Sequence, residues 1–201
     1  MDFTLIPLSR LDPAGLNSLT TLHCAVMHGL LTDLGQPLVM RYYASARETA
    51  SVLGVCAIAP HGEVLGWAMG SPDPAALNAR LRQPVLWFAG QMTRVAFSRP
   101  GVILELMRSL FSASAANKLD NGQVELTYIG TAVQARGEGL GQQILAAFIA
   151  QARSAGYKSI SLSVETDNSS ALALYSKAGF HITHTFTEGR FQRHRMQYPC
   201  S

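Results

Sequence analysis

The stretch from Val124 to Gln151 reads VELTYIGTAVQARGEGLGQQILAAFIAQ, and it predicts a strand, a glycine-rich loop and a helix in succession. Residues Val124 to Ala132 alternate apolar and β-favouring side chains, as a strand does. Helical spacing runs from Leu140 to Ala152. The loop between them is crowded with one arginine and three glycines: Arg136, Gly137, Gly139 and Gly141.

This loop predicts a phosphate-binding site. The first N–H groups of a helix lack partners and lie at the positive end of its dipole, and glycines let a ligand approach the backbone. A P-loop would need Gly-Lys-Ser/Thr where this chain has Gly141, Gln142 and Gln143. The dinucleotide motif G-x-G-x-x-G would need a glycine in place of Ile144. Both of these loop types are therefore excluded.

The spacing R-x-x-G-x-G resembles the pyrophosphate loop of the GNAT acetyltransferases, which bind acetyl-coenzyme A. A second motif matches the family pattern N-x-x-A-x-x-L-Y-x-x-x-G-F, at Asn168, Ala171, Leu174, Tyr175, Gly179 and Phe180. The resemblance covers Val124 to Tyr198, and the first half of the chain follows only in outline. It implies an α/β fold with a mixed, mostly antiparallel central sheet flanked by helices.

Composition favours one cytosolic domain spanning residues 1–201. Charged residues are 14% of the chain, against roughly 25% in average soluble domains, and 48% are hydrophobic. No apolar run is long enough to span a bilayer, and the start of the chain lacks the features of a secretion signal. The three cysteines are too few and scattered for a disulfide framework.

Charge argues against a nucleic-acid partner. The net charge is +3, without a Lys/Arg-rich run. The whole excess lies between Ser71 and Gly122, which holds six basic and three acidic residues: Arg80, Arg82, Arg94, Arg99, Arg108, Lys118, Asp73, Glu105 and Asp120.

The predicted elements follow a regular order, with one departure from the minimal family pattern. A short strand and two helices are expected first, then a hairpin around residues 60–62; after the glycine loop come its helix, a strand, a helix and a closing hairpin. Between the third and fourth strands, about residues 71–122 predict a helical insertion with helices at 74–81, 85–96 and 101–114. It is a lid over the acceptor, an extension of the core, or a homodimer contact.

The resemblance assigns three groups of residues to acetyl-coenzyme A. Loop amides would hold the pyrophosphate: Arg136, Gly137, Glu138, Gly139, Leu140, Gly141 and Gln142. Main-chain groups at the strand end would bond the pantetheine arm, with the Thr131 N–H polarising the thioester carbonyl: Ile129, Gly130, Thr131, Ala132 and Val133. Asn168, Ser170 and Tyr175 complete the set, and Asn168 also suits a helix cap.

Two residues bear on the course of the strand end that would bind the pantetheine arm. Val133 stands where the family usually has a proline. Gly130 indicates either a bulge or a close backbone approach.

Acetyl transfer needs a proton donor for the departing thiolate and a proton acceptor for the amine. Tyr175 aligns with the general acid of the family, and a phenol is protonated at neutral pH. Glu125 is a candidate base, because alternation places it on the same strand face as Thr131 if no bulge intervenes. Three alternatives remain: a water chain acts as the base, Glu125 binds the ammonium group of the substrate, or Glu125 pairs with an arginine.

The sequence therefore predicts an N-acetyltransferase that acts by direct attack of a primary amine, expected to belong to a small molecule, without a metal. Three alternatives stay open: a non-catalytic acyl-coenzyme A binding or sensing module, an enzyme that acts on protein N termini or lysines, and one that uses a longer acyl donor. His181, His184 and His194 fall on two hairpin strands, but no cysteine or carboxylate joins them at metal-ligand spacing.

Overall fold

The computed structural model describes the chain except residues 1, 83, 99–100, 102–118, 190 and 201. Its centre is a seven-stranded sheet in the order β1-β2-β3-β4-β5-β7-β6. The β4–β5 pair is parallel and every other pair is antiparallel, which confirms the predicted mixed sheet. The strands are β1 Thr4–Pro7, β2 Leu53–Ile58, β3 Val64–Ser71, β4 Gln123–Thr131, β5 Ser159–Glu165, β6 His181–Glu188 and β7 Phe191–Pro199.

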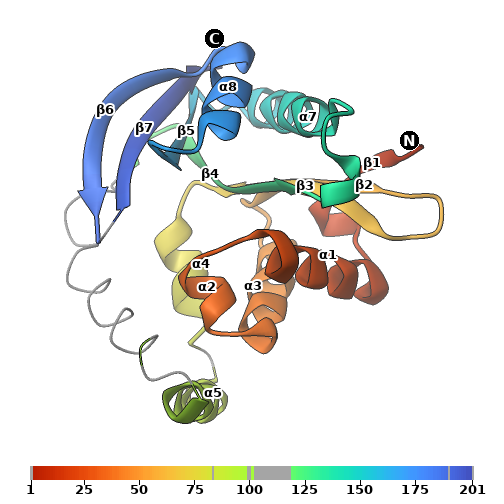
Figure 1. The fold of residues 1–201 in the computed structure, drawn as a ribbon, viewed down its shortest axis with the longest axis vertical. Helices are drawn as coiled ribbons and strands as arrows, with labels where there is room; N and C mark the ends of the chain where they lie inside the picture. Colours follow the sequence, from red (N-terminus) through yellow and green to blue (C-terminus); the bar gives the residue numbers. More distant parts are fainter. Residues whose placement is uncertain (1, 83, 99–100, 102–118, 190, 201) are drawn as a thin grey trace.

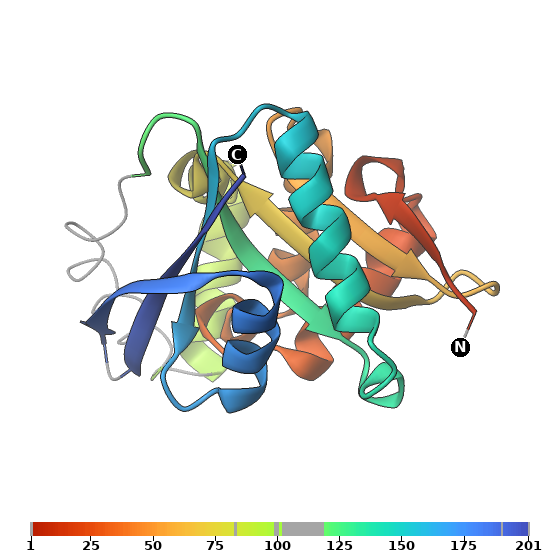
Figure 2. The same ribbon diagram turned by 90° about the horizontal axis from the view of Figure 1, so that it is seen from above.

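Helices cover both faces of this sheet (Figure 1). One face carries α7 and α8, and the other carries the helices of the first half of the chain; seen from above, α7 runs across the middle strands (Figure 2). The helices are α1 Pro13–Val26, α2 Leu30–Asp33, α3 Gln36–Glu48, α4 Pro74–Arg80, α5 Val85–Ser98, α7 Leu140–Ser154 and α8 Ser169–Ala178. Two 3-10 turns, η1 Leu8–Arg10 and η2 Val133–Ala135, complete the described elements.

Local sequence accounts for the helix ends. Asp12 caps α1, its carboxylate accepting from the Gly15 N–H at 2.7 Å, and Pro13 occupies the first turn. Asp73 caps α4 in the same way, accepting from the Ala76 N–H at 2.9 Å. Both caps lie where an Asp-Pro pair precedes an apolar run.

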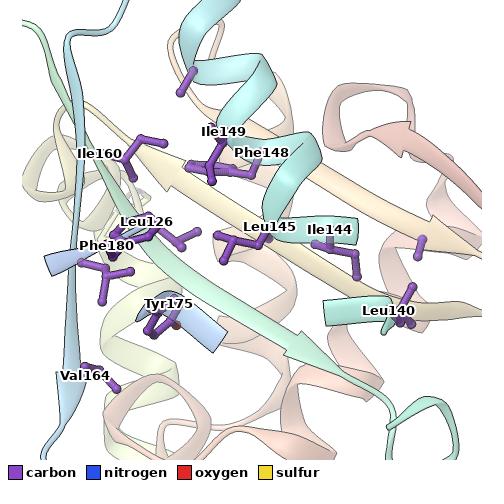
Figure 3. Packing of buried hydrophobic residues seen from close by; sticks show 14 of the residues in the cluster. Leu126, Leu140, Ile144, Leu145, Phe148, Ile149, Ile160, Val164, Tyr175 and Phe180 are labelled. Carbon is purple, nitrogen blue, oxygen red and sulfur yellow. The ribbon is translucent and has the colours of Figure 1, made fainter. Parts of the chain in front are cut away.

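Each face of the sheet has its own apolar core. Side chains of α7 and α8 pack on β4 and β5 in the first, including the fully buried Ile144, Leu145 and Phe148 (Figure 3). The second core joins α1, α3 and α4 to β2 and β3 around Trp67.

The segment between β3 and β4, predicted as a helical insertion, contains α4 and α5, which differ in burial. Leu77 and Leu81, in and just after α4, are buried in the second core, so this part extends the core. By contrast, α5 leaves Leu86 and Phe97 each 88% exposed. The third expected helix, at 101–114, falls almost entirely outside the described residues. In the described part of the chain, no helix is long and apolar enough to cross a membrane.

A bulge interrupts the pairing of the two central strands. Met69 pairs with Tyr128 and Gly70 with Leu126, so Thr127 is an extra residue of β4 without a partner on β3. An extra residue of this kind reverses the faces of all side chains beyond it.

Gly70 lies beside this bulge and has no room for a side chain. A Cβ there would overlap the carbonyl oxygen of Glu125 and lie 2.7 Å from Cζ of Phe148. We expect Gly70→Ala to lower the free energy of unfolding by about 2 kcal/mol, because neither neighbour can yield without disturbing the core. Urea denaturation measures this change.

Gly90 in α5 is the matched control, since an added Cβ there meets nothing within 4 Å. Gly90→Ala should leave stability unchanged or raise it by up to about 1 kcal/mol, because alanine favours a helix. Equal effects of the two substitutions would contradict the tight packing at Gly70.

Candidate active site

The glycine loop presents backbone donors at the start of α7. Gly137 and Gly139 have φ values of 85° and 77°, in the left-handed region that favours glycine. The N–H of Arg136 donates to Val133 O at 3.2 Å, and the N–H of Gln142 donates to Gly139 O at 3.1 Å. Between them, no backbone hydrogen bond from the N–H groups of Gly137, Gly139, Leu140 or Gly141 occurs among the described residues. These four groups are therefore the donors that suit a phosphate.

Beside this loop the sheet opens between β4 and β5. The two parallel strands pair only from Gln123–Ser159 to Glu125–Ser161. Beyond Glu125, the described part of β4 is paired with β3 alone, and beyond Ser161, β5 is paired with β7 alone. Main-chain groups on the two facing edges thus lack a strand partner, which suits an extended polar ligand such as a pantetheine arm.

Part of the predicted pantetheine-binding stretch is already occupied. The N–H of Ala132 donates to Leu65 O at 2.8 Å, and Val133 begins the turn η2. Ile129, Gly130 and Thr131 remain on β4 along the opening.

Glu125 and Thr131 point to opposite faces of the sheet, contrary to the expectation from simple alternation. Val124 and Leu126 are buried in the core beneath α7 and α8, so Glu125 between them faces α1 and α3. Beyond the bulge at Thr127 the alternation is shifted, and the Thr131 methyl lies near Gly141 at the start of α7. The same-face prediction was wrong because the bulge intervenes.

The bulge is also not at Gly130, where one was considered. Gly130 pairs regularly with Trp67, and a Cβ on it would lie 2.8 Å from Cζ3 of that indole. The glycine therefore leaves room for the Trp67 side chain, and no close backbone approach occurs among its nearest contacts in the described structure.

Glu125 forms a nearly enclosed ion pair. Its Oε1 accepts from Nη1 of Arg195 at 3.1 Å, and the two side chains are 14% and 10% exposed. An arginine was one predicted alternative partner for this carboxylate, and in the structure that arginine is Arg195.

A polar sheet face surrounds this pair. Ser159, Ser161, Ser163 and Glu165 alternate on β5 with the buried Ile160, Leu162 and Val164. On β7, Arg193 contacts Glu188 at 2.7 Å and Glu165 at 3.6 Å. Ser161 is 5% exposed, and its Oγ has no hydrogen-bond partner in the described structure.

Sequence reasoning missed these polar residues, although the period-two pattern of Arg193, Arg195 and Gln197 was visible. That pattern indicates a polar strand face. It does not show which strand lies beside it.

Tyr175 belongs to α8 and packs into the core on the other face of the sheet. It is 7% exposed and packs against Phe180, with ring centroids 5.7 Å apart (Figure 3). Burial raises the pKa of its hydroxyl above the ordinary value of about 10, so the phenol stays protonated well into the alkaline range. Tyr175 is therefore protonated at neutral pH, as a general acid must be.

The start of α8 is built as a cap. Oδ1 of Asn168 accepts from the Ala171 N–H at 3.1 Å, which confirms its capping role. Ser170 lies exposed in the first turn of the same helix. The amide nitrogen of Asn168 and the hydroxyl of Ser170 remain as candidate contacts for the coenzyme.

Aromatic rings line the α1 and α3 side of β4. The rings of His23, Tyr42 and Tyr43 lie 5.0 to 6.5 Å from that of Tyr128, centroid to centroid. Burial raises the pKa of Tyr128 to about 12, partly offset by the charge of Arg193. Burial also raises the pKa of Tyr42, to which the charges of Tyr128 and Glu125 add. This face is therefore polar at the ion pair and aromatic beside it.

Two of the three hairpin histidines contact different threonines. His194 Nδ1 lies 2.7 Å from Thr185 Oγ1, and His184 Nδ1 lies 3.2 Å from Thr183 Oγ1. No group of three His, Cys, Asp or Glu side chains suited to a metal occurs in the part of the chain that is described.

Comparisons with known proteins agree with this geometry. Residues 19–180 match the family model described as the acetyltransferase (GNAT) family. A 63-residue stretch is 40% identical to the mycothiol acetyltransferase of Clavibacter sepedonicus, covering 31% of this chain. That alignment spans only 21% of the relative's own length.

Solved structures share the fold. The protein yncA of Salmonella typhimurium, solved with its cofactor acetyl-CoA, is 16% identical with a TM-score of 0.62, covering 100% of this chain and 95% of that one. The ribosomal-protein-S18-alanine N-acetyltransferase of Escherichia coli is 15% identical with a TM-score of 0.60, at the same coverage. Identities at this level show the fold alone, whereas the family model spans most of the chain. The chain belongs to the GNAT acetyltransferase family and is an acyltransferase.

Proposed function

We propose that this protein transfers the acetyl group of acetyl-coenzyme A to a primary amine of a small molecule by direct attack. In this reaction the amine nitrogen bonds to the acetyl carbon and the carbon–sulfur bond breaks. The amine loses a proton and the departing thiolate gains one. Each of these requirements has a candidate residue in the chain.

The N–H groups of Gly137, Gly139, Leu140 and Gly141 would hold the pyrophosphate, with the Arg136 side chain beside them. The unpaired edge of β4 from Ile129 to Thr131 would bond the pantetheine arm. Asn168 and Ser170 would contact the coenzyme from the start of α8.

Tyr175 would protonate the thiolate, and Glu125 would take the amine proton, directly or through a water. The observation that carries the proposal is their placement: the strands part beyond Glu125 and Ser161, with Tyr175 on one face and Glu125 on the other. Coenzyme and acceptor could then enter from opposite faces and meet in the opening.

Burial of the ion pair supports a slender acceptor. Glu125 is only 14% exposed, so a group that reaches its carboxylate must fit a narrow space. An unhindered primary amine meets this condition. The relative named mycothiol acetyltransferase is consistent with a small acceptor.

The coenzyme part of the proposal is tested in the glycine loop. A Cβ on Gly141 would meet only Leu174 and Thr131, at 3.8 and 3.9 Å, which is ordinary contact. The fold should therefore accept Gly141→Asp, whereas the carboxylate would repel phosphate. We expect acetyl-coenzyme A binding to weaken at least tenfold, or about 1.4 kcal/mol, by calorimetry.

Gly141→Asn is the matched control, because it has nearly the same shape without the charge. It should lose less affinity than Gly141→Asp, and the gap between the two should shrink at high salt. Unchanged affinity in a folded Gly141→Asp protein would refute the phosphate assignment.

A further inference from the structure

Arg195 is an enclosed cation whose contact with Glu125 reaches across a strand. Arg195 belongs to β7, where it pairs in register with Ser163 of β5. Glu125 belongs to β4 and pairs with Ser161 of β5. The guanidinium therefore crosses β5 to bond a carboxylate two strands away, at the point where β4 and β5 separate.

This contact constrains the carboxylate strongly. A guanidinium is planar and always charged, so it fixes the direction of the oxygen that it bonds. At 10% and 14% exposure, solvent competes little for either partner. Removing one partner of such a pair leaves an uncompensated charge, which is costly.

The neighbouring hydroxyl of Ser161 indicates a third group at this place. Its Oγ is buried and has no hydrogen-bond partner among the described residues. Buried hydroxyls are normally satisfied by protein, water or ligand. A water or an acceptor amine that enters the opening beside Glu125 would complete its bonding.

We propose that Arg195 is a positioning residue for acetyl transfer, which holds the Glu125 carboxylate beside Ser161 so that it takes the proton of the acceptor amine. The inference rests on the proposed function of Glu125. Arg195 does not touch the reacting atoms, and its effect passes through Glu125.

A second arginine of β7 provides the comparison. Arg193 also forms ion pairs, but with Glu165 and Glu188, whose side chains are 40% and 38% exposed. Arg193 lies on the same strand as Arg195, carries the same charge and also contacts carboxylates. Among the ion pairs of the described residues, it has none with Glu125. Its removal therefore shows what loss of an arginine on this sheet face does by itself.

The test is a double-mutant cycle on turnover. Glu125→Gln, Arg195→Met and the double variant are compared by thiol release from acetyl-coenzyme A, with the best acceptor from a panel of aminosugars, amino-acid amides and polyamines. We expect Arg195→Met to lower kcat at least tenfold while the Kd of acetyl-coenzyme A stays within twofold. The double variant should turn over no more slowly than Glu125→Gln alone, because both act through one carboxylate.

Two further variants separate positioning from folding. Arg195→Lys keeps a cation, and its kcat should be at least threefold higher than that of Arg195→Met. Arg193→Met should keep kcat within threefold. If Arg195→Met fails to fold, the double variant provides the test, because it removes both charges of the Glu125–Arg195 pair and should fold. If the kcat of the double variant equals that of Glu125→Gln, the inference is supported. If it is tenfold or more below that of Glu125→Gln, the inference is overturned.

Failure of this inference is distinct from failure of the proposed function. A wild-type protein that binds acetyl-coenzyme A and acetylates none of these amines would refute the proposed function before any variant is made. An active wild-type protein whose Arg195→Met variant keeps full kcat would refute only the role of Arg195.

Discussion

Tyr175→Phe is expected to lower kcat by about 10² to 10⁴, the usual cost of losing a general acid. Burial raises the pKa of the hydroxyl, so it carries its proton throughout the neutral range. The substitution removes one oxygen and keeps the ring against Phe180. Acetyl-coenzyme A affinity should therefore change by less than about threefold. Steady-state kinetics and calorimetry measure the two effects.

Tyr198→Phe is the control for this experiment. Tyr198 also packs on Phe180, at 5.2 Å between centroids, and its hydroxyl accepts from Arg153 at 2.7 Å. It loses the same atom from the same aromatic group, but outside the proposed site. Its kcat should stay near the wild-type value. Equal kcat in the wild type and Tyr175→Phe would show that Tyr175 only packs in the core and is not the general acid.

The elements of the fold could be predicted because their signals are local. The Asp-Pro caps, the glycines with positive φ and the alternation of β5 each act over a few residues. The two family motifs likewise predicted a glycine loop before one helix and a second helix that carries Tyr175, and the structure has both elements. None of these signals depends on which strands become neighbours.

The proposed acceptor side of the site depends on contacts between residues that are distant in sequence. Arg195 meets Glu125 only because β7 lies directly beside β5, ahead of β6 in the sheet. The bulge at Thr127 exists only in the pairing of β4 with β3, and it moved Thr131 away from the face of Glu125. The alternation of polar residues along β7 could have predicted that one face of this strand is polar. It could not have predicted which strand lies beside β7.

A buried histidine should make folding depend on pH. His23 is 0% exposed and its Nδ1 lies 2.8 Å from the Tyr43 hydroxyl. Burial lowers the pKa of His23 from 6.5 to about 4, so the folded protein keeps it neutral where the unfolded chain takes up a proton. At about 1.36 kcal/mol for each pKa unit, this difference corresponds to about 3 kcal/mol.

The sign follows from which state binds the proton. Above pH 6.5 His23 is neutral in both states and its full contribution to stability is present. As pH falls from 6.5 to about 4, only the unfolded state gains a proton, and the free energy of unfolding falls by up to about 3 kcal/mol. Below that range both states are protonated and the loss from His23 stops. Urea denaturation at several pH values between 4 and 7.5 measures the slope.

His23→Asn isolates the contribution of His23 to the pH dependence of stability, because an amide can replace Nδ1 in the contact with Tyr43 and does not titrate. Whatever its stability at pH 7.5, its loss between pH 6.5 and 4 should be smaller than that of the wild type by about 3 kcal/mol. His61→Asn is the matched control for the substitution itself, since the His61 side chain is 70% exposed. The rings that face His23 are tyrosines and a tryptophan, which do not change charge in this window. Parallel pH curves for wild type and His23→Asn would therefore show that His23 titrates equally in the folded and unfolded chain.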